Sequence, residues 1–303
     1  MSTPMVFVAL PVFNRLEETK KFIGCIREQT YPNIQVVICD DGSTDGTGDY
    51  LRRSAPEVIV IDGTGDLWWT GGINRCIEYI LSVCAEEDLV ITINNDVQLK
   101  PDYVTQKVER SESMHGAIIG SVCVYQDEPD RIETSGLMLN RITCTTRPLV
   151  PTNGSISAIH IRGCVPATNL PAKGVLVPVE VYRKIGIYDF DNFPHYHADT
   201  DFTLRAVEQG IPVVVDFDSV VYSDVNRDNL ISGDDITLSN IMKTFDKQSG
   251  VNNFLAYRAF ARKHFGVRAW QYLLVNYSKI FLGLLRRYLM AKVSAFEIAR
   301  NER

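Results

Sequence analysis

Residues 6–14 read Val-Phe-Val-Ala-Leu-Pro-Val-Phe-Asn, an apolar run that ends at a polar side chain. The pattern returns at residues 34–46 (Ile-Gln-Val-Val-Ile-Cys-Asp-Asp-Gly-Ser-Thr-Asp-Gly) and at residues 89–96 (Leu-Val-Ile-Thr-Ile-Asn-Asn-Asp). Each apolar, β-branched run predicts a buried strand of a parallel sheet. Polar and acidic residues therefore gather at the carboxyl ends of neighbouring strands, the edge at which open α/β sheets bind ligands.

Helical patterns separate these strands. Residues 16–29 place apolar side chains on one face, and residues 72–85 do so more clearly, at i, i+3, i+4 and i+7 spacing. A short helix is expected near Tyr50, and residues 58–61 form a further strand. Strands that alternate with helices through short links imply a parallel sheet.

The second half of the chain changes character. Residues 116–180 are strand-like with longer loops, and a helix at 199–209 precedes a late strand at 213–215. Strand signals then end, and the chain reads as helical from about residue 236. We therefore expect a catalytic domain over residues 1–235 and a separate helical region over residues 236–303.

Composition limits the class of protein. The chain has 303 residues, of which 45% are hydrophobic, so global disorder is excluded. The net charge of −6 gives no argument for nucleic acid, but it is uneven: residues 256–303 carry +8 and residues 1–255 carry −14. Seven cysteines without a CxxC pair indicate reduced thiols in a cytoplasmic protein. We see no signal peptide, and no apolar run reaches the ~18 residues of a membrane span.

Four short motifs in one order carry a family resemblance: Pro11-Val12-Phe13-Asn14, then residues 40–46, then Asn94-Asn95-Asp96, then Asp199-Thr200-Asp201 followed by Arg205. Together they resemble the inverting glycosyltransferases of family 2. The resemblance implies an α/β GT-A fold, with a mostly parallel central sheet flanked by helices and here a C-terminal helical appendage. It also implies a nucleotide-sugar donor and a glycan or lipid-linked acceptor, in bacterial surface polysaccharide synthesis.

The family pattern gives Asp41 a role in binding the donor. The second Asp of this turn accepts a hydrogen bond from the imide N–H of uracil or thymine in the resembling enzymes. Backbone groups near Pro11 and Phe13 would flank the base, with Asn14 beside them. The alternative is a solvated turn, because Asp, Gly and Ser favour turns anyway.

Asn94-Asn95-Asp96 occupies the place of the DxD motif of the family. The resemblance implies that Asp96 binds Mg²⁺ or Mn²⁺ together with the donor phosphates, since hard cations prefer oxygen ligands. Asn94 departs from the pattern, and one fewer charge should weaken the metal before the donor binds. The alternative is a cap for the following turn.

The segment Gly65-Asp66-Leu67-Trp68-Trp69-Thr70-Gly71-Gly72 precedes the clearest helix. Glycines at a helix N-terminus leave bare N–H groups that suit a phosphate, so Gly71 and Gly72 are candidate donor ligands. Trp69 and its neighbour could form a wall of the pocket. The segment resembles the donor loop of rhamnosyltransferase-like bacterial members, in which an Asn stands where Asn74 stands here. The alternative is that both tryptophans anchor the core.

Asp199 matches the Asp that supplies the catalytic base in the family, although Ala198 replaces the preceding Glu. A carboxylate near the acceptor hydroxyl can take its proton during attack at the anomeric carbon. Arg205 lies four residues after Asp201, so those two can form an ion pair, and we expect a structural role for Asp201. His195 and His197 lie nearby, but a lone histidine in such a loop is usually not a ligand.

A second metal signal lies at residues 224–235. Asp224, Asn226, Asp228 and Asp235 fall at ligand positions of an EF-hand-like loop, which resembles a single dockerin-type Ca²⁺ loop. The alternative is an acidic surface loop. Relatives often carry a metal-binding His here, so a third protein ligand for the donor metal is in doubt.

The basic C-terminal helices carry apolar stripes. Such helices lie peripherally on an anionic membrane, here its inner face, or they pack on the catalytic domain or on a second copy in a homodimer. The sequence does not choose among these partners. Two other activities also stay open: a nucleotidyltransferase of related fold, although a Gly-rich triphosphate loop is lacking, and an inactive sugar-nucleotide-binding protein, which Asn94 and Ala198 favour.

Overall fold

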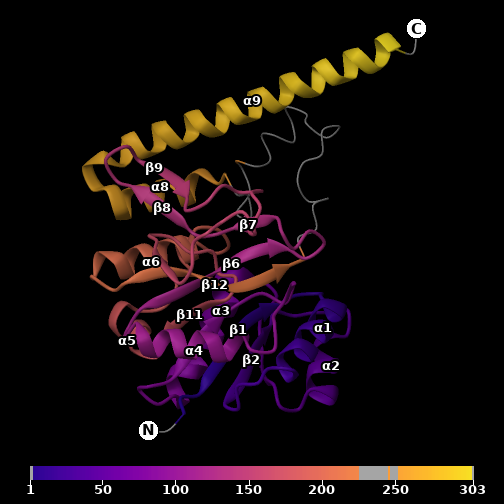
Figure 1. The fold of residues 1–303 in the computed structure, drawn as a ribbon, viewed down its shortest axis with the longest axis vertical. Helices are drawn as coiled ribbons and strands as arrows, with labels where there is room; N and C mark the ends of the chain where they lie inside the picture. Colours follow the sequence, from indigo (N-terminus) through magenta and orange to yellow (C-terminus); the bar gives the residue numbers. More distant parts are fainter. Residues whose placement is uncertain (1–2, 225–244, 246–251, 302–303) are drawn as a thin grey trace. The chain divides into compact units, whose positions relative to one another are not determined.

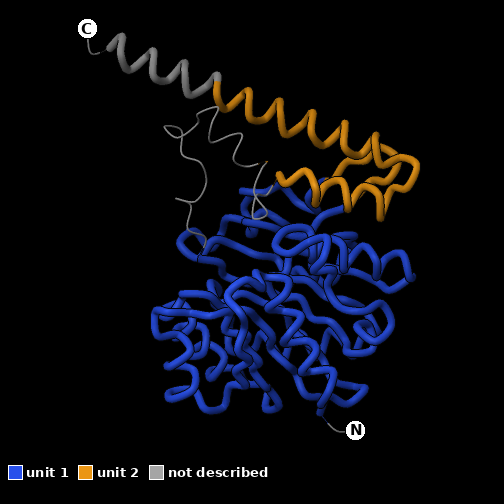
Figure 2. Tube along the Cα trace, turned by 180° about the vertical axis from the view of Figure 1, so that it is seen from behind, with its two compact units in different colours: residues 1–138, 147–225 blue, residues 139–146, 226–303 orange. Residues whose placement is uncertain are grey.

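The computed structural model describes residues 3–224, 245 and 252–301. The chain divides into two compact units (Figure 2). Unit 1 comprises Met1–Met138 and Arg147–Val225, and unit 2 comprises Leu139–Thr146 and Asn226–Arg303. The boundary expected at residue 235 lies outside the described residues. Nothing in the sequence pattern indicated that residues 139–146 belong with the C-terminal helices.

The central sheet belongs to unit 1. Its strands are β1 (Val6–Val12), β2 (Ile34–Asp40), β3 (Ile59–Asp62), β4 (Leu89–Thr92), β5 (Val97–Gln98), β6 (Ile118–Tyr125), β7 (Ile132–Thr134), β10 (Cys164–Pro166), β11 (Val175–Pro178) and β12 (Val213–Ser223). The spatial order is β10-β12-β6-β11-β4-β1-β2-β3, with β5 on β12 and β7 on β6. Figure 1 labels β12, β6, β11, β1 and β2 of this sheet. Neighbours β4, β1, β2 and β3 are parallel, as are β6 and β12, whereas β11 is antiparallel to both of its neighbours. The expected mostly parallel sheet is confirmed.

Helices flank this sheet in unit 1. They are α1 (Leu16–Arg27), α2 (Thr47–Ser54), α3 (Trp68–Val83), α4 (Tyr103–Ser113), α5 (Val179–Ile185) and α6 (Ala198–Glu208). In α1, Phe22, Ile23 and Ile26 are buried, as the apolar spacing predicts. The expectations at 16–29 and 199–209 are confirmed, whereas α3 begins at Trp68 rather than at Gly72.

Strand register brings the polar residues of three strands to one edge. Val12 pairs with Asp40 at the ends of β1 and β2, and Ala9 pairs with Thr92 in β1 and β4. The hydrogen bonding between β1 and β2 continues past the end of β2, because Asp41 N–H donates to the carbonyl of Val12 at 2.9 Å. The segments that follow β1, β2 and β4 therefore lie side by side, as the sequence predicts.

Strands β11 and β12 carry later segments to the same edge. The N–H of Gly174, just before β11, donates to Thr92 O at 3.0 Å. Strand β12 runs to Ser223, further than the expected 213–215, and Asp224 N–H then donates to Asp96 O at 2.8 Å. The end of β12 thus lies beside the Asn-Asn-Asp segment.

Unit 2 contains α8 (Phe254–Phe265), the 3₁₀ turn Gly266–Arg268 and α9 (Ala269–Asn301). The paired strands β8 (Leu137–Asn140) and β9 (Thr145–Pro148) cross the boundary between the two units. Aromatic rings join the two helices: Tyr272 of α9 lies 4.5 Å from Phe265 and 5.5 Å from Phe260, between ring centroids. The β8–β9 turn is tied to them by Asn276, whose amide donates to Cys144 O at 3.2 Å. The described part of the expected C-terminal helical region is helical.

Among the described residues, no helix combines the length and apolar character that a membrane span requires.

Candidate active site

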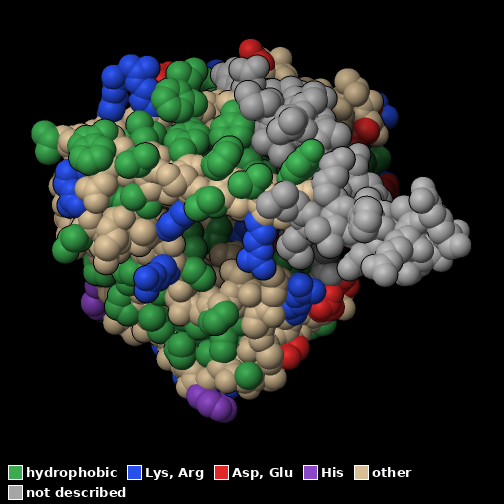
Figure 3. Space-filling model, turned by 90° about the horizontal axis from the view of Figure 1, so that it is seen from above, with side chains coloured by type: hydrophobic (Ala, Val, Ile, Leu, Met, Phe, Trp, Pro, Cys, Tyr) green, Lys and Arg blue, Asp and Glu red, His purple; other side chains and the backbone are tan. Residues whose placement is uncertain are grey.

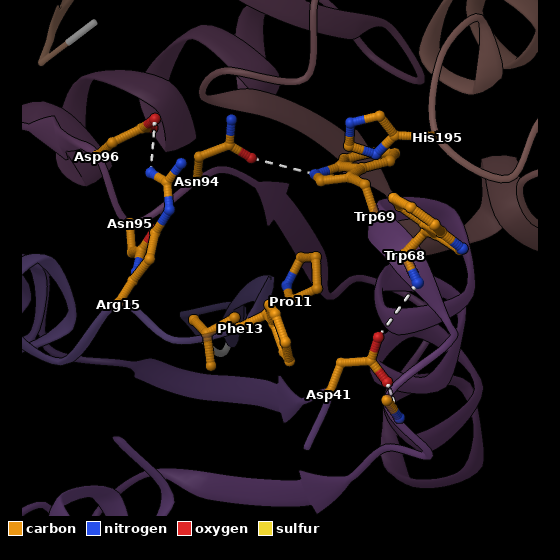
Figure 4. Close-up of a pocket in the computed structure, with 12 residues that line it drawn as sticks. Pro11, Phe13, Arg15, Asp41, Trp68, Trp69, Asn94, Asn95, Asp96 and His195 are labelled. Atoms are coloured by element: carbon orange, nitrogen blue, oxygen red, sulfur yellow. Dashed lines mark hydrogen bonds and ion pairs between the residues drawn. The ribbon is translucent and has the colours of Figure 1, made fainter. Parts of the chain in front are cut away.

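A cavity of about 420 Å³ opens at the carboxyl ends of β1, β2 and β4 in unit 1 (Figure 4). Its size falls within the range of small-molecule sites. It is lined by Pro11, Val12, Phe13, Arg15, Asp41, Gly65, Trp68, Trp69, Asn94, Asn95, Asp96 and His195. The structure therefore brings the first three sequence motifs and the tryptophan segment into one pocket.

Asp41 holds the loop before α3. Its Oδ1 accepts the N–H of Gly65 at 2.8 Å, and its Oδ2 accepts those of Leu67 and Trp68 at 3.0 and 3.2 Å (Figure 4). Asp41 is 5% exposed, so these bonds satisfy a carboxylate that would otherwise be costly to bury. The charge also suits the N-terminal end of α3, where the helix dipole is positive. This carboxylate has a structural task that its motif alone did not reveal.

The expectation that Gly71 and Gly72 lie at the N-terminus of a helix is wrong. Helix α3 begins at Trp68, and Gly71 N–H already donates to Leu67 O at 2.9 Å. Both glycines instead permit close packing, because a Cβ at Gly72 would lie 2.6 Å from Pro11 Cβ. Of the N–H groups at this helix start, those of Leu67 and Trp68 donate to Asp41, and that of Thr70 donates to Pro194 O at 3.1 Å.

The Asn-Asn-Asp segment divides its side chains between the pocket wall and the core. Asn94 Oδ1 accepts the indole N–H of Trp69 at 3.1 Å, which fixes the ring against the cavity. Asn95 is 6% exposed and donates to Thr19 Oγ1 of α1 at 2.9 Å. Asn94 thus orients a pocket wall, and Asn95 joins β4 to α1.

Asp96 offers one oxygen that fits a cation. Its Oδ2 lies 3.2 Å from Arg15 Nη1 (Figure 4), whereas its Oδ1 is buried without a hydrogen-bond partner. An unsatisfied buried carboxylate oxygen on a residue that lines a pocket suits a divalent cation. Within the described ranges, no group of three or more His, Cys, Asp and Glu side chains could hold a metal. The described side chains would therefore leave coordination positions of a cation at Asp96 open to a bound molecule.

Two other candidates bind the protein backbone rather than face the cavity. Asn14, at φ 51°, accepts the N–H of Thr44 at 2.7 Å and so joins β1 to the Asp-rich turn. Asn74 exchanges two hydrogen bonds with the backbone of Tyr188, at 2.8 and 3.1 Å. Neither side chain lines the pocket, and donor contact by either stays a prediction.

Asp199 lies in the first turn of α6. Its Oδ1 accepts the N–H of Thr200 at 2.7 Å, and its Oδ2 accepts that of Ala172 at 3.3 Å. Burial raises the pKa of this carboxyl, a direction that suits a general base working near neutral pH. It is not among the residues that line the cavity, and its catalytic role stays a prediction.

Asp201 has the structural role that the sequence predicts. It is fully buried and accepts Arg205 Nε at 2.8 Å. Arg205 also donates to the carbonyls of Ile185 and Ile187. This network attaches α6 to the end of α5, so the expected ion pair is confirmed.

Sequence reasoning gave Arg15 no role and treated His195 as an unremarkable loop histidine. Arg15 directly follows Asn14, the last residue of the first motif, and this position could have predicted that Arg15 lies at the site. His195 lies 5.7 Å from Trp68 between ring centroids, and its buried Nδ1 has no hydrogen-bond partner. Both line the cavity.

The suggested calcium loop is almost wholly outside the described residues. Asp224 alone is described, and its backbone contact with Asp96 was given above. Asn226, Asp228 and Asp235 lie outside the described ranges, so Ca²⁺ binding there stays a prediction.

Comparison with known proteins gives two curated relatives. The succinoglycan biosynthesis protein ExoA of Rhizobium meliloti (strain 1021) is 27% identical over 221 residues, which are 71% of this chain and 62% of ExoA. The glycosyltransferase AglE of Haloferax volcanii is 38% identical over 52 residues, 16% of this chain and 17% of AglE. The chain thus spans less than two thirds of the length of either relative.

Solved structures resemble the fold at low sequence identity. The mannosyltransferase PcManGT of Pyrobaculum calidifontis, solved with GDP-Man and Mn²⁺, gives a TM-score of 0.57 at 14% identity, over 99% of this chain and 76% of that one. GalNAc-T7, solved with UDP, GalNAc and Mn²⁺, gives a TM-score of 0.59 at 10% identity, over 73% of this chain and 44% of that one. TarS of S. aureus gives a TM-score of 0.51 at 14% identity, over 87% of this chain and 44% of that one. These likenesses show that the fold is GT-A.

The profile of one protein family matches residues 7–163, more than half of the chain. The matched range contains every strand end that forms the cavity, from Pro11 to Asp96. The chain therefore belongs to glycosyl transferase family 2, with the GT-A fold.

Proposed function

We propose that this protein transfers a sugar from a UDP- or dTDP-sugar to a hydroxyl of a glycan or lipid-linked acceptor, with inversion. The observation that carries the proposal is the cavity in which Asp41, Asp96 and an aromatic wall converge. The similarity to ExoA supports bacterial surface polysaccharide synthesis as the setting, and the rhamnosyltransferase-like loop supports a dTDP-rhamnose-like donor.

The nucleotide base would bind between the end of β1 and the tryptophan segment. Phe13 is 54% exposed and Trp68 is 42% exposed, so both rings present open faces for stacking. Asp41 Oδ1 accepts one N–H, which leaves it capacity to accept the imide N–H of uracil or thymine. The same carboxylate would thus shape the loop and read the base.

The diphosphate would bind near Asp96, together with Mg²⁺ or Mn²⁺. Asp96 would hold the cation through the buried Oδ1, and the bound metal would offset the charge that develops on the leaving diphosphate. Arg15 is the second positive group at this position. Its guanidinium can pair with phosphate oxygens when Asp96 is engaged elsewhere.

The acceptor hydroxyl would give its proton to Asp199 as its oxygen attacks the anomeric carbon. Attack from the face opposite the diphosphate inverts the configuration at that carbon. The backbone bonds to Ala172 and Thr200 fix the carboxylate, and its raised pKa makes it a better proton acceptor than an ordinary aspartate.

All seven cysteines are free thiols, which supports the proposed cytoplasmic location. We also propose that the C-terminal helical region serves docking rather than chemistry.

The test is release of nucleoside diphosphate from a panel of UDP-, dTDP- and GDP-sugars with glycan and lipid-linked acceptors, each with Mn²⁺. We expect turnover with a UDP- or dTDP-sugar, and loss of at least about 10²-fold in kcat for Asp199→Asn. Asp191→Asn, which removes an exposed carboxylate earlier in the same stretch of sequence, is the matched control.

Three results would contradict parts of the proposal. Preference for GDP-mannose over every other donor refutes the donor assignment, and full turnover by Asp199→Asn refutes the base. Donor binding without turnover on any acceptor would support the alternative of an inactive sugar-nucleotide-binding protein.

A further inference from the structure

The described end of unit 2 has an unusual charge composition. Residues 252–288 contain seven Lys and Arg residues and no Asp or Glu. The seven are Arg258, Arg262, Lys263, Arg268, Lys279, Arg286 and Arg287. Such a segment attracts anionic surfaces and repels a copy of itself.

One face of α9 exposes large apolar side chains. Trp270, Leu274, Phe281 and Leu285 are 67%, 61%, 64% and 41% exposed. At about 100° per residue they lie within an arc of about 60°, so they form one stripe. Figure 3, which draws one face of the molecule with side chains coloured by type, shows hydrophobic side chains gathered on that view with Lys and Arg side chains among them. We call these four residues the apolar stripe.

The opposite face of α9 is already occupied. Tyr272 lies about 170° from the middle of the stripe and packs on Phe260 and Phe265 of unit 2, and Asn276, about 150° from it, donates to Cys144 O. Tyr277 lies beside the stripe and contacts Tyr257, with ring centroids 5.3 Å apart. The apolar stripe is therefore not needed to hold α8 and α9 together. Val267, in the turn before α9, is 93% exposed and adds to the apolar surface at that end.

Leu282 widens the apolar face of α9, because it lies about 60° beyond Leu285 by helical position. Arg286 and Lys279 lie about 40° and about 60° beyond Leu282, so they border this widened face and not the apolar stripe itself. Leu282 is itself 61% exposed. Long basic side chains at the edge of an apolar face can reach headgroups while the apolar face enters the acyl region.

From these observations we propose that the apolar stripe of α9 docks on an anionic lipid surface, with the helix lying in the plane of the interface. A second copy of this chain is the less suitable occupant, because residues 269–288 of its corresponding helix would bring further basic residues and no acid to pair with them. The proposal rests on unit 2 alone and does not depend on the enzymatic assignment.

The test uses the full-length protein and co-sedimentation with two kinds of vesicle. One is phosphatidylcholine alone, and the other is phosphatidylcholine and phosphatidylglycerol in equal parts. We expect binding to the mixed vesicles. This binding should weaken as the salt concentration rises from about 0.15 M to about 1 M, because the screening length shortens from ~8 Å to ~3 Å. Tryptophan emission should shift to shorter wavelength on binding, and Trp270→Phe should keep binding but lose most of the shift.

Substitutions distinguish the contribution of the apolar stripe to vesicle binding from the general effect of an added negative charge. Phe281→Glu and Leu285→Glu should each lower the partition coefficient by about tenfold or more, since each removes an apolar side chain from the membrane. Val83→Glu makes the same charge change at a 55% exposed position of α3 and should leave binding unchanged. Both stripe positions are exposed, so circular dichroism should show the folded protein in every case.

Absence of wild-type binding to both vesicle types would overturn the proposal. Equal losses for Val83→Glu and Phe281→Glu would do so as well, because the apolar stripe would then have no special part. A dimer that dissociates on Phe281→Glu, with no vesicle binding, would assign the face to a second copy instead.

Discussion

Arg15 Nη1 lies 3.2 Å from Asp96 Oδ2, so a cation of the protein itself sits at the carboxylate that matches the metal motif. Their side chains are 47% and 20% exposed. Ion pairs this exposed contribute about 0–1 kcal/mol to stability, so a ligand can readily displace Arg15 from Asp96. The ion pair neutralises Asp96 while no nucleotide is bound, and it places a positive group where a diphosphate would lie.

Removal of Arg15 should therefore affect metal and nucleotide in opposite directions. For Arg15→Gln we expect Mn²⁺ affinity without nucleotide to rise, by up to about fivefold, and UDP or dTDP affinity to fall. Calorimetric titration of each ligand measures both. Lys20→Gln removes a similar charge from an ion pair with Glu17 on the same helix and serves as control. Unchanged affinities for both ligands would show that Arg15 has no part in either.

Asn94 offers a second test of the metal site. Asn94→Asp restores an acid, and a carboxylate can still accept the indole N–H of Trp69. We expect Mn²⁺ to bind about tenfold more tightly without nucleotide, because a second carboxylate ligand adds charge. Asp96→Asn should abolish that binding. Electron paramagnetic resonance of free Mn²⁺ measures both.

The control for that substitution is Asn140→Asp, which adds the same charge at an exposed position of β8. If Asp96→Asn leaves Mn²⁺ binding intact, the cation binds elsewhere.

Asp41→Asn should destabilise the protein as well as weaken nucleotide binding. The amide keeps one acceptor oxygen but turns an NH₂ group toward the N–H groups of the loop before α3. We expect the free energy of unfolding to fall by about 2 kcal/mol, as for other lost bonds to a buried charged group. Denaturant titration measures the loss. Asp49→Asn removes an exposed carboxylate of α2, and a similar loss there would contradict the explanation.

His197 predicts a particular sensitivity to acid. Burial lowers its pKa to about 4 from the ordinary 6.5, so the unfolded chain binds a proton over a pH range in which the folded chain does not. Stability should therefore fall as the pH drops from 6.5 toward 4, by up to about 3 kcal/mol. His197→Asn should flatten this part of the profile of Tm against pH, because the asparagine side chain does not titrate. The variant should still fold, since Asn tolerates the left-handed φ of 72°.

The exposed His160, replaced by Asn, is the control for that profile. An unchanged slope in the His197 variant would show that other groups cause the acid sensitivity.

The sheet edge and its motifs could be predicted because they depend on local pattern. A run such as residues 89–93 is buried whatever lies next to it, so its polar end must lie at the edge of the sheet. The start of α3 could not be predicted, because the acceptor for its N–H groups is Asp41, 26 and 27 residues earlier. The role of Arg15 depends in the same way on a partner 81 residues away.

The described contacts of Asp41 with the loop before α3 all involve main-chain N–H groups. Any amino acid except proline supplies such a group, so the loop can keep its path while its side chains change. Trp68 and Trp69 thus stand on a frame held by main-chain groups, although the left-handed φ of 54° at Trp68 disfavours β-branched replacements there. For an engineer this marks a natural place for a small library: varying these two positions would sample new walls for the sugar nucleotide while the carboxylate anchor is left intact.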